Sequence, residues 1–375
     1  MTKIKIILSE IRNKRIRNGI SLSDIAKTIN IGEDWLSAVE EGTTTPSFEL
    51  VYAIAEASNV RLSNVLSELA EQDKAITTLS RKISAEEDKE GNLIFTFQYN
   101  DYQATYTLVD ATLDQYNELL SNLRSKTYNK EMKKSEYVID SFFKAIELWP
   151  NSNPSDIWGF FLSRLYQDPY NHPVSEQHRD FAQSWKRTSG WVLEEIFVRH
   201  YREFLFENGI VIGIYKKKEV KEYLKKMNLN YHDVEEKADV LLIDNKSGEC
   251  FGVVHVKASL AERRQADQSF SEALLAKNYF SPFMTMDCKS FPSANPINKG
   301  ELGPVKTADE DQRINKRLDF EEEGYFSACY SYNTNTLPTP LGQKATARVH
   351  VMDFKQVNDA FSDAVISARN KLFSG

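Results

Sequence analysis

The chain has 375 residues, 41% hydrophobic and 27% charged, which is the composition of an ordinary soluble protein with a sizeable core. No apolar run approaches the ~18 residues that a membrane-spanning helix needs, and the short apolar run at the N-terminus excludes a secretory signal. The three cysteines form no CxxC pair, which excludes a disulfide framework and a cysteine zinc cluster, so we expect a cytoplasmic protein. With a net charge of −7, any nucleic-acid site must concentrate its positive charge locally.

The secondary-structure pattern changes several times along the chain. Residues 5–70 show short helical patterns, and the polar stretch 80–92 is interpreted as a linker. Residues 93–109 alternate apolar and polar side chains on both sides of a turn signal, which predicts a β-hairpin. Helical periodicity follows over 111–148, and from Phe181 onward helical and strand patterns alternate.

These patterns predict an α/β (α+β) protein whose mixed central sheet is flanked by helices, together with an all-α N-terminal domain. We expect a helical domain over residues 1–75, a linker region with a hairpin and helices over 76–150, and a catalytic domain over 151–375. At roughly 150 residues per domain, the length agrees with two or three domains.

The N-terminal helical patterns have the spacing of two helices joined by a short turn. Ser21 or Ser23 can cap the first helix, Asn30 turns the chain, and Gly42 and Pro46 separate the second helix from the next. The first helix carries Ile25, Ala26 and Ile29, and the second is predicted to have a buried face that consists of Trp35, Leu36 and Val39. This block resembles the helix-turn-helix domain of the Cro/repressor (XRE) family, and the resemblance implies a DNA-binding fold.

The first turn of the second helix, which reads bases in that family, is acidic in this chain. It holds Glu33 and Asp34 beside Gly32 and Ser37. Carboxylates repel phosphates, although they can accept a hydrogen bond from cytosine N4. The preceding helix carries cations that could hold phosphates, namely Arg12, Lys14, Arg15 and Arg17. Two interpretations stay open: base recognition, and a helical bundle used for dimerisation or for packing against the catalytic domain.

Two predicted strands bring a carboxylate and a lysine together. The strand over 240–243 follows Asp239, and the strand over 250–256 leads into Lys257. Such a pair at adjacent strand ends suits metal-assisted phosphodiester cleavage, in which the carboxylate holds Mg²⁺ and the metal and the lysine polarise the phosphate and the attacking water. The arrangement resembles the core of the PD-(D/E)xK nucleases.

The residue two positions before the lysine departs from that core. It is His255 instead of Asp or Glu, and neutral imidazole is a poor ligand for Mg²⁺. The segment that follows resembles the CCGG-specific branch of the type II restriction endonucleases, which carries its second carboxylate on the next helix. This resemblance implies Glu272 as the second metal ligand, with Glu262 as its competitor. We interpret His255 as a half-buried strand histidine held by a neighbour, and the alternative is a role in positioning water or phosphate.

An upstream helix over 189–205 offers a further carboxylate. Nucleases of this core often carry such a helix, with a glutamate four residues after a glycine, and Gly190 and Glu194 have this spacing. Glu194 would face inward together with Phe197 and Tyr201, where an unpaired carboxylate is costly unless a cation meets it. We therefore expect Glu194 to support the metal site, with an ordinary surface charge as the alternative.

The helix start after Lys257 carries side chains that suit base recognition. These are Ser259, Arg263, Arg264 and Asp267. Arginine pairs with guanine and aspartate accepts from cytosine, so a two-fold dimer could read CCGG. The resemblance, closest to the BsaWI-like members of the branch, implies the same assignment with A·T pairs outside it. A candidate phosphate patch further on consists of Arg313, Lys316 and Arg317. A solvated helix face is the alternative interpretation of both sets.

Together these features predict a homodimeric type II restriction endonuclease that cuts double-stranded DNA with Mg²⁺ as its cofactor. Asp239 and Glu272 would bind the metal, Glu194 would support it, and Lys257 would orient water or stabilise the pentavalent phosphate. A cognate cytosine methyltransferase is expected in the same system. The alternatives are a transcriptional regulator with a C-terminal sensory domain and a repair nuclease without sequence specificity.

Overall fold

The structure is a computed structural model that describes residues 3–41, 43–69, 83–99, 102–128, 133–173, 176, 179–229, 238–260, 263–288 and 297–373. The chain forms two compact units, Met1–Arg81 and Lys82–Gly375. The three-part division made from the sequence stays a prediction. Among the described residues, no helix combines the length and the apolar character needed to cross a bilayer.

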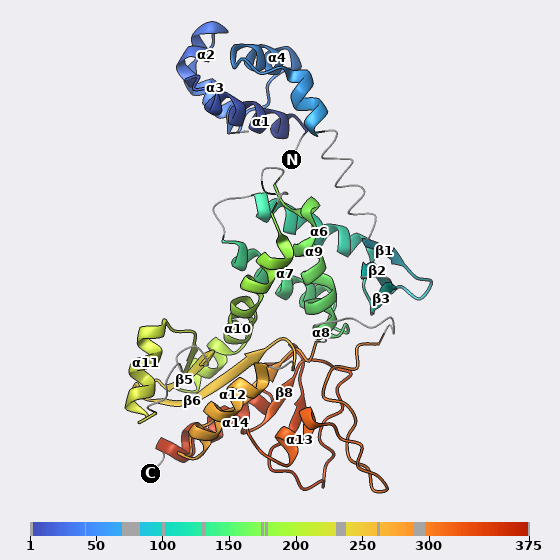
Figure 1. Ribbon diagram of the computed structural model, residues 1–375, viewed down its shortest axis with the longest axis vertical. Helices are drawn as coiled ribbons and strands as arrows, with labels where there is room; N and C mark the ends of the chain where they lie inside the picture. The colour runs from blue at the N-terminus through green and yellow to red at the C-terminus, as the bar shows by residue number, and fades with distance from the viewer. Residues whose placement is uncertain are drawn as a thin grey trace. The chain divides into compact units, whose positions relative to one another are not determined.

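The first unit is a small helical bundle (Figure 1). Its helices are α1 (Lys3–Arg17), α2 (Leu22–Thr28), α3 (Glu33–Glu40) and α4 (Phe48–Ala57), with a further helical segment over residues 62–69. Ser21 caps α2 by accepting from the Asp24 amide at 3.1 Å, and Asn30 turns the chain in the left-handed conformation with φ of 54°. Leu36 and Val39 are buried as predicted, but Trp35 is 39% exposed, so its predicted burial is wrong.

The second unit begins with a three-stranded antiparallel sheet of order β1-β2-β3. The predicted hairpin is confirmed in β2 (Leu93–Tyr99) and β3 (Tyr102–Leu108), whereas its turn at residues 100 and 101 lies outside the described residues. The linker prediction is wrong for β1 (Ile83–Glu87), which pairs with β2. Because β1 is an edge strand, its charged side chains suit the position and discourage pairing with other chains.

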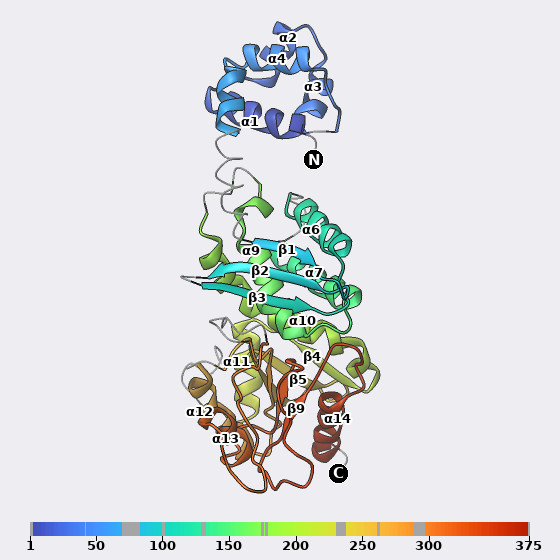
Figure 2. The same cartoon turned by 90° about the vertical axis from the view of Figure 1, so that its right-hand side faces the viewer.

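Helices pack beside this first sheet (Figure 2). They are α6 (Leu113–Tyr128), α7 (Lys134–Leu148), the short α8 (Pro154–Asp156), a π-helical turn η1 (Ile157–Leu162), α9 (Ser163–Gln167) and a 3-10 turn η2 (Pro169–Asn171). Aromatic contacts join the two layers: the Phe95 ring of β2 lies 6.3 Å from Tyr116 of α6 and 5.9 Å from Phe161 of η1. The long helix α10 (Phe181–Glu207) then leads from these helices to the second sheet (Figure 1).

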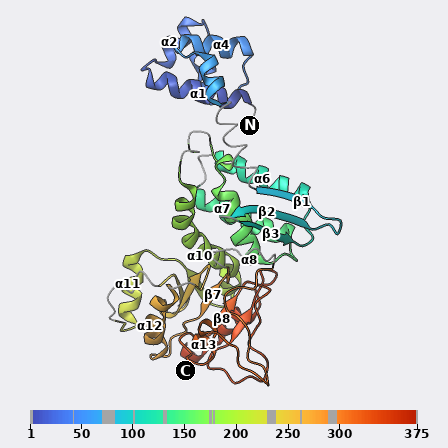
Figure 3. The same ribbon diagram turned by 45° about the vertical axis from the view of Figure 1, so that its right-hand side comes forward.

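The second sheet has six strands in the order β4-β5-β6-β7-β8-β9. They are β4 (Ile210–Gly213), β5 (Val240–Asp244), β6 (Cys250–Lys257), β7 (Phe283–Thr285), β8 (Cys329–Ser331) and β9 (Val349–Val351). β5 pairs antiparallel with both β4 and β6, and the pairs from β6 through β9 are parallel, so the sheet is mixed as predicted. The helices around it are α11 (Lys217–Lys226), α12 (Arg263–Leu275) and α13 (Asn315–Glu321) (Figure 3), together with α14 (Ala360–Phe373) (Figure 1).

Alternate residues of the central strands bury opposite faces of this sheet. Leu242 joins the core formed with α10 and α14, whereas Leu241 joins the core formed with α11 and α12. The period of two along a strand produces this division. Gly252 lies where β6 meets Phe280, and a Cβ on this glycine would come within 2.7 Å of the Phe280 carbonyl oxygen. A larger residue there would disturb the strand that carries the site described next.

Candidate functional site

Asp239 and Lys257 meet at the ends of adjacent strands. Asp239 directly precedes β5, Lys257 is the last residue of β6, and Lys257 Nζ donates to Asp239 Oδ2 at 2.6 Å. The same carboxylate oxygen accepts from the Val256 amide at 2.8 Å. The backbone of β6 therefore fixes the carboxylate beside the ammonium group.

A second carboxylate reaches the same ammonium group from α12. Asp267 Oδ2 lies 3.2 Å from Lys257 Nζ, and the Asp267 side chain is only 5% exposed. Burial lowers the pKa of Lys257, but the two carboxylates outweigh this effect, so the pKa is raised overall and the side chain is charged. The cluster thus holds one cation between two acids, of which Asp267 is buried and Asp239 is partly buried.

Glu194 of α10 interacts electrostatically with this cluster. Burial raises the pKa of Glu194 to about 8, the charge of Asp239 adds to the rise, and Lys257 opposes it. The neighbouring Glu195 pairs with Arg202 at 3.0 Å instead. Carboxyl groups with strongly raised pKa values are typical of functional sites. A cation bound at this acidic cluster would favour the ionised form of Glu194.

His255 completes the polar group at this end of the sheet. One oxygen each from Asp239 and Asp267 and one ring nitrogen of His255 lie within 4.8 Å of one another. The imidazole is fully buried, and its Nε2 lies 3.0 Å from Ser281 Oγ. Burial lowers the pKa of His255 to about 3, with Lys257 contributing, so the ring is neutral. Two carboxylates and a neutral imidazole are a donor set that fits a divalent metal ion.

Glu272 lies elsewhere on α12. It is exposed, whereas Asp267, Phe270, Ser271 and Leu274 are the buried residues of that helix. Its charge acts on Tyr325, whose pKa is raised by Glu323 first, then by burial and by Glu272. The structure brings together Asp239, Lys257, Asp267 and Glu194, and places Glu272 on a different face of the helix. The metal-binding role of Glu272 stays a prediction.

The predicted base-reading residues surround the start of α12. Arg263 and Arg264 occupy its first turn, but their side chains and Glu262 lie outside the part of the chain that the structure describes. Ser259 is half-buried in the bend after β6. Their contacts with bases therefore stay predictions, and only Asp267 of this set is seen in the cluster.

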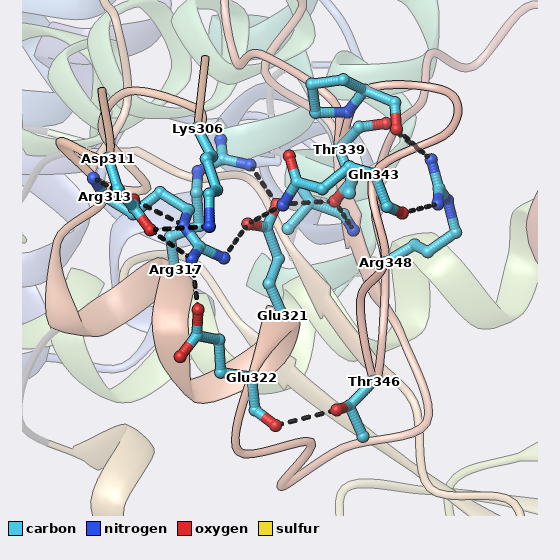
Figure 4. A network of polar contacts seen from close by, with 12 residues as sticks. Lys306, Asp311, Arg313, Arg317, Glu321, Glu322, Thr339, Gln343, Thr346 and Arg348 are labelled. Atoms are coloured by element: carbon cyan, nitrogen blue, oxygen red, sulfur yellow. Dashed lines mark hydrogen bonds and ion pairs between the residues drawn. The ribbon is translucent and has the colours of Figure 1, made fainter. Parts of the chain in front are cut away.

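The proposed phosphate patch near α13 is largely an internal ion-pair network (Figure 4). Arg317 is fully buried, and its Nη1 donates to Glu321 Oε1 at 2.9 Å. The Arg313 side chain is 2% exposed and pairs with Glu321 Oε2 at 3.1 Å and with Asp311 at 2.6 Å. The phosphate interpretation is wrong for Arg317, which is fully buried, and the guanidinium group of Arg313 is already paired with carboxylates. Lys316 is more exposed and pairs with Glu301 at 3.1 Å.

In the N-terminal unit one predicted phosphate contact is also internal. Arg15 is buried and forms two hydrogen bonds of 2.8 Å each with the carboxylate of Glu40. This bidentate pair joins α1 to α3. Glu33 and Asp34 are exposed on the first turn of α3, so the face that would read bases is acidic in the structure as well.

Comparisons with known proteins identify both parts of the chain. Residues 11–64 match the helix-turn-helix family. The chain is 31% identical over 274 residues to the type II restriction enzyme AgeI of Thalassovita gelatinovora, a match that covers 70% of this chain and 94% of the relative. The chain belongs to the type II restriction endonucleases.

The fold of this restriction endonuclease agrees with that assignment. The crystal structure of specific restriction endonuclease AgeI in complex with DNA is similar with a TM-score of 0.63 and 28% identity, over 73% of this chain and 98% of the other. A BsaWI–DNA complex matches with a TM-score of 0.35 and 14% identity, over 70% and 92% of the two chains. The predicted family, the restriction-endonuclease-like fold and the helix-turn-helix domain are confirmed.

As a type II restriction endonuclease, the protein is a site-specific deoxyribonuclease. Both alternatives considered from the sequence, a sensory regulator and an unspecific repair nuclease, are set aside by this assignment. Asp267 was assigned to base recognition from the sequence, whereas the structure has it beside Lys257 in the acidic cluster. Its spacing of three and seven residues before Phe270 and Leu274 is the signal that could have placed it on the buried face.

Proposed function

We propose that the restriction endonuclease cleaves both strands of double-stranded DNA with Mg²⁺ at a palindromic site with a CCGG core. The observation that carries this proposal is the cluster of Asp239, Lys257 and Asp267 at adjacent strand ends, with Glu194 nearby. In a chain of this family, a partly buried group of acids around one lysine is the place where phosphodiester chemistry is expected.

Asp239 and Asp267 would hold the divalent ion, with Glu194 as a supporting carboxylate. When bound, the ion supplies Lewis-acid polarisation of the phosphate and lowers the pKa of a water ligand. The amide of Val256 fixes Asp239 by donating to Oδ2, so that its second oxygen keeps its direction. Lys257 stays protonated, and its ammonium group is suited to orient the attacking water or to stabilise the charge on the pentavalent phosphate.

We place Asp267 at the metal rather than at a base edge. Its side chain is 5% exposed and is already engaged by Lys257, so a base in the major groove could not reach it without opening the cluster. Arg263, Arg264 and Ser259 keep their proposed role in base reading, because they lie directly between the end of β6 and the body of α12. Arginine is suited to guanine O6 and N7 in a C·G pair.

A palindromic site has two equivalent half-sites, each of which needs its own recognition surface, so we propose that the enzyme acts as a homodimer on DNA. The outer bases are proposed to be A·T pairs. A host that carries this enzyme needs a cognate cytosine methyltransferase, since an unmodified chromosome would be cut.

Digestion of sequenced plasmid and phage DNA with mapped fragment ends tests this proposal. We expect discrete fragments whose ends all fall at one sequence that contains CCGG, and protection of the same DNA by methylation of its cytosines. Discrete ends at a sequence without CCGG would overturn the specificity. A DNA that stays intact with Mg²⁺, and also with Mn²⁺, would overturn the assignment of the cleaving cluster.

A further inference from the structure

The imidazole of His255 has one nitrogen with a hydrogen-bond partner and one without. Nε2 lies 3.0 Å from Ser281 Oγ, whereas Nδ1 is buried with no hydrogen-bond partner among the described residues. The ring is enclosed by Phe270 and Phe326, at centroid separations of 5.8 and 5.2 Å. A buried nitrogen lone pair without a partner is costly, so its retention calls for a ligand.

A chain of hydrogen bonds can set the tautomer of this ring. Ser281 Oγ lies 2.6 Å from Ser271 Oγ, so the Ser281 hydroxyl can donate to Ser271 while accepting from His255 Nε2. This arrangement puts the imidazole proton on Nε2 and leaves the Nδ1 lone pair available. Histidines that bind metals commonly donate their other ring N–H to such a partner, which fixes the tautomer and the ring orientation.

The same ring belongs to the acidic cluster. His255 and Lys257 are two residues apart on β6 and therefore share one face of the strand, the face covered by α12. A ring nitrogen lies within 4.8 Å of an oxygen from Asp239 and from Asp267. Since Nε2 is engaged by Ser281, Nδ1 is the nitrogen available to an ion held by these two carboxylates.

We propose that His255 Nδ1 is a nitrogen ligand of the divalent metal ion held by Asp239 and Asp267. This inference rests on the proposed function, because it adds a ligand to the metal site of the same reaction. One imidazole beside two carboxylates favours first-row transition ions over Mg²⁺, and Co²⁺ more than Mn²⁺. Ser281 is then a positioning residue that acts through the histidine.

Pulsed electron paramagnetic resonance of the Mn²⁺-loaded, DNA-free protein tests the proposal, with the full chain carrying no polyhistidine tag. We expect a ¹⁴N coupling of a directly bound histidine nitrogen in the wild-type protein and its absence in His255→Gln. Glutamine keeps a donor of similar reach for Ser281 but offers no imidazole nitrogen. His350→Gln is the matched control and should keep the coupling, because His350 lies on β9, three strands away from β6.

Affinity supplies a second readout. His255→Gln should weaken Mn²⁺ binding by about tenfold or more, in line with the loss caused by removing groups around a metal, while Mg²⁺ binding changes less. Equal weakening of both ions would contradict a nitrogen ligand. If the glutamine variant does not fold, the wild-type spectrum decides the point, since a Mn²⁺ signal without ¹⁴N coupling overturns the proposal.

The variant Asp239→Asn separates this inference from the proposed function. Mn²⁺ that binds in an Asp239-dependent manner but shows no ¹⁴N coupling would overturn the role of His255 alone. Mn²⁺ whose binding does not depend on Asp239 would overturn the metal site itself. Coupling that disappears in both His255→Gln and Asp239→Asn, and persists in His350→Gln, supports the two proposals together.

Discussion

Replacement of Asp267 by asparagine separates the two candidates for the second metal-binding carboxylate. Asn has the same shape, so Asp267→Asn removes the charge from a side chain that is 5% exposed and 3.2 Å from Lys257 Nζ. At that separation and an effective dielectric constant near 20, two unit charges attract by about 5 kcal/mol before desolvation. In Asp267→Asn a divalent ion would lose an attraction of comparable size to this carboxylate. If about 4 kcal/mol of transition-state stabilisation is lost, cleavage slows about 10³-fold.

The matched variant is Glu272→Gln, which removes a charge from the exposed face of the same helix. We expect it to cleave within about threefold of the wild-type rate, because surface substitutions away from such a site have small effects. Single-turnover cleavage of one plasmid site, with excess enzyme and saturating Mg²⁺, measures the rate for both variants. A gel shift in Ca²⁺ shows whether DNA binding is retained.

One result would refute our placement of the carboxylates. If Glu272→Gln lost cleavage while Asp267→Asn cut at the wild-type rate, Glu272 would be the metal ligand, as the family resemblance implies. Equal losses in both variants, with DNA binding and thermal unfolding unchanged, would mean that both side chains act at the ion. The buried position of Asp267 beside Lys257 would then not be sufficient to choose between them.

Four further changes have expected outcomes. Lys257→Ala should retain DNA binding in a gel shift and lose detectable plasmid cleavage, and cutting at the wild-type rate would contradict its role. In EDTA, the free energy of unfolding of the wild-type protein should fall as pH rises between about 4.5 and 8. The cause is Glu194, whose pKa is about 8 in the folded protein against 4.5 ordinarily, so that it keeps its proton to higher pH when folded. In guanidinium titrations, Glu194→Gln should remove this part of the pH dependence, which is at most about 5 kcal/mol. Glu40→Ala leaves Arg15 without its buried carboxylate and should destabilise the N-terminal unit by about 3–5 kcal/mol in amide hydrogen exchange. Glu321→Gln should lower the melting temperature of the second unit, since buried Arg317 loses its carboxylate partner and Arg313 keeps only its other carboxylates. An unchanged temperature would contradict a stabilising role of the network.

Elements whose structure depends on neighbouring residues were predicted correctly from the sequence. The strands around Asp239 and Lys257 are short apolar runs bounded by polar turn residues, and the structure has them as β5 and β6. The helix-turn-helix was visible because its caps and its turn at Asn30 depend on neighbouring residues alone. In such segments the residues that determine the structure lie close together in the sequence, so their pattern can be recognised without knowledge of the fold.

Features that depend on distant partners were not visible. β1 carries charged side chains and was interpreted as part of a linker, since only its pairing with β2 makes it a strand. Arg317 was interpreted as part of a phosphate patch or of a solvated helix face, yet it is buried, and Glu321, Leu337 and Gly303 provide acceptors for it. Leu337 and Gly303 lie in loops whose courses no periodicity predicts, whereas Glu321 is four residues further along α13 and this pairing was readable from the spacing.

Asp267 differs from these, because its position could have been worked out from α12 alone. Phe270 and Leu274 are four residues apart and mark the buried face of the helix, and Asp267 lies three residues before Phe270. Glu272, five residues after Asp267, is rotated well away from that face. The distance along the chain from Lys257 favoured Glu272, but in a helix the angle around the axis decides which side chain reaches the sheet. We therefore propose that helical phase, and not spacing from the lysine, identifies the second metal-binding carboxylate, and the Asp267 and Glu272 variants test this proposal directly.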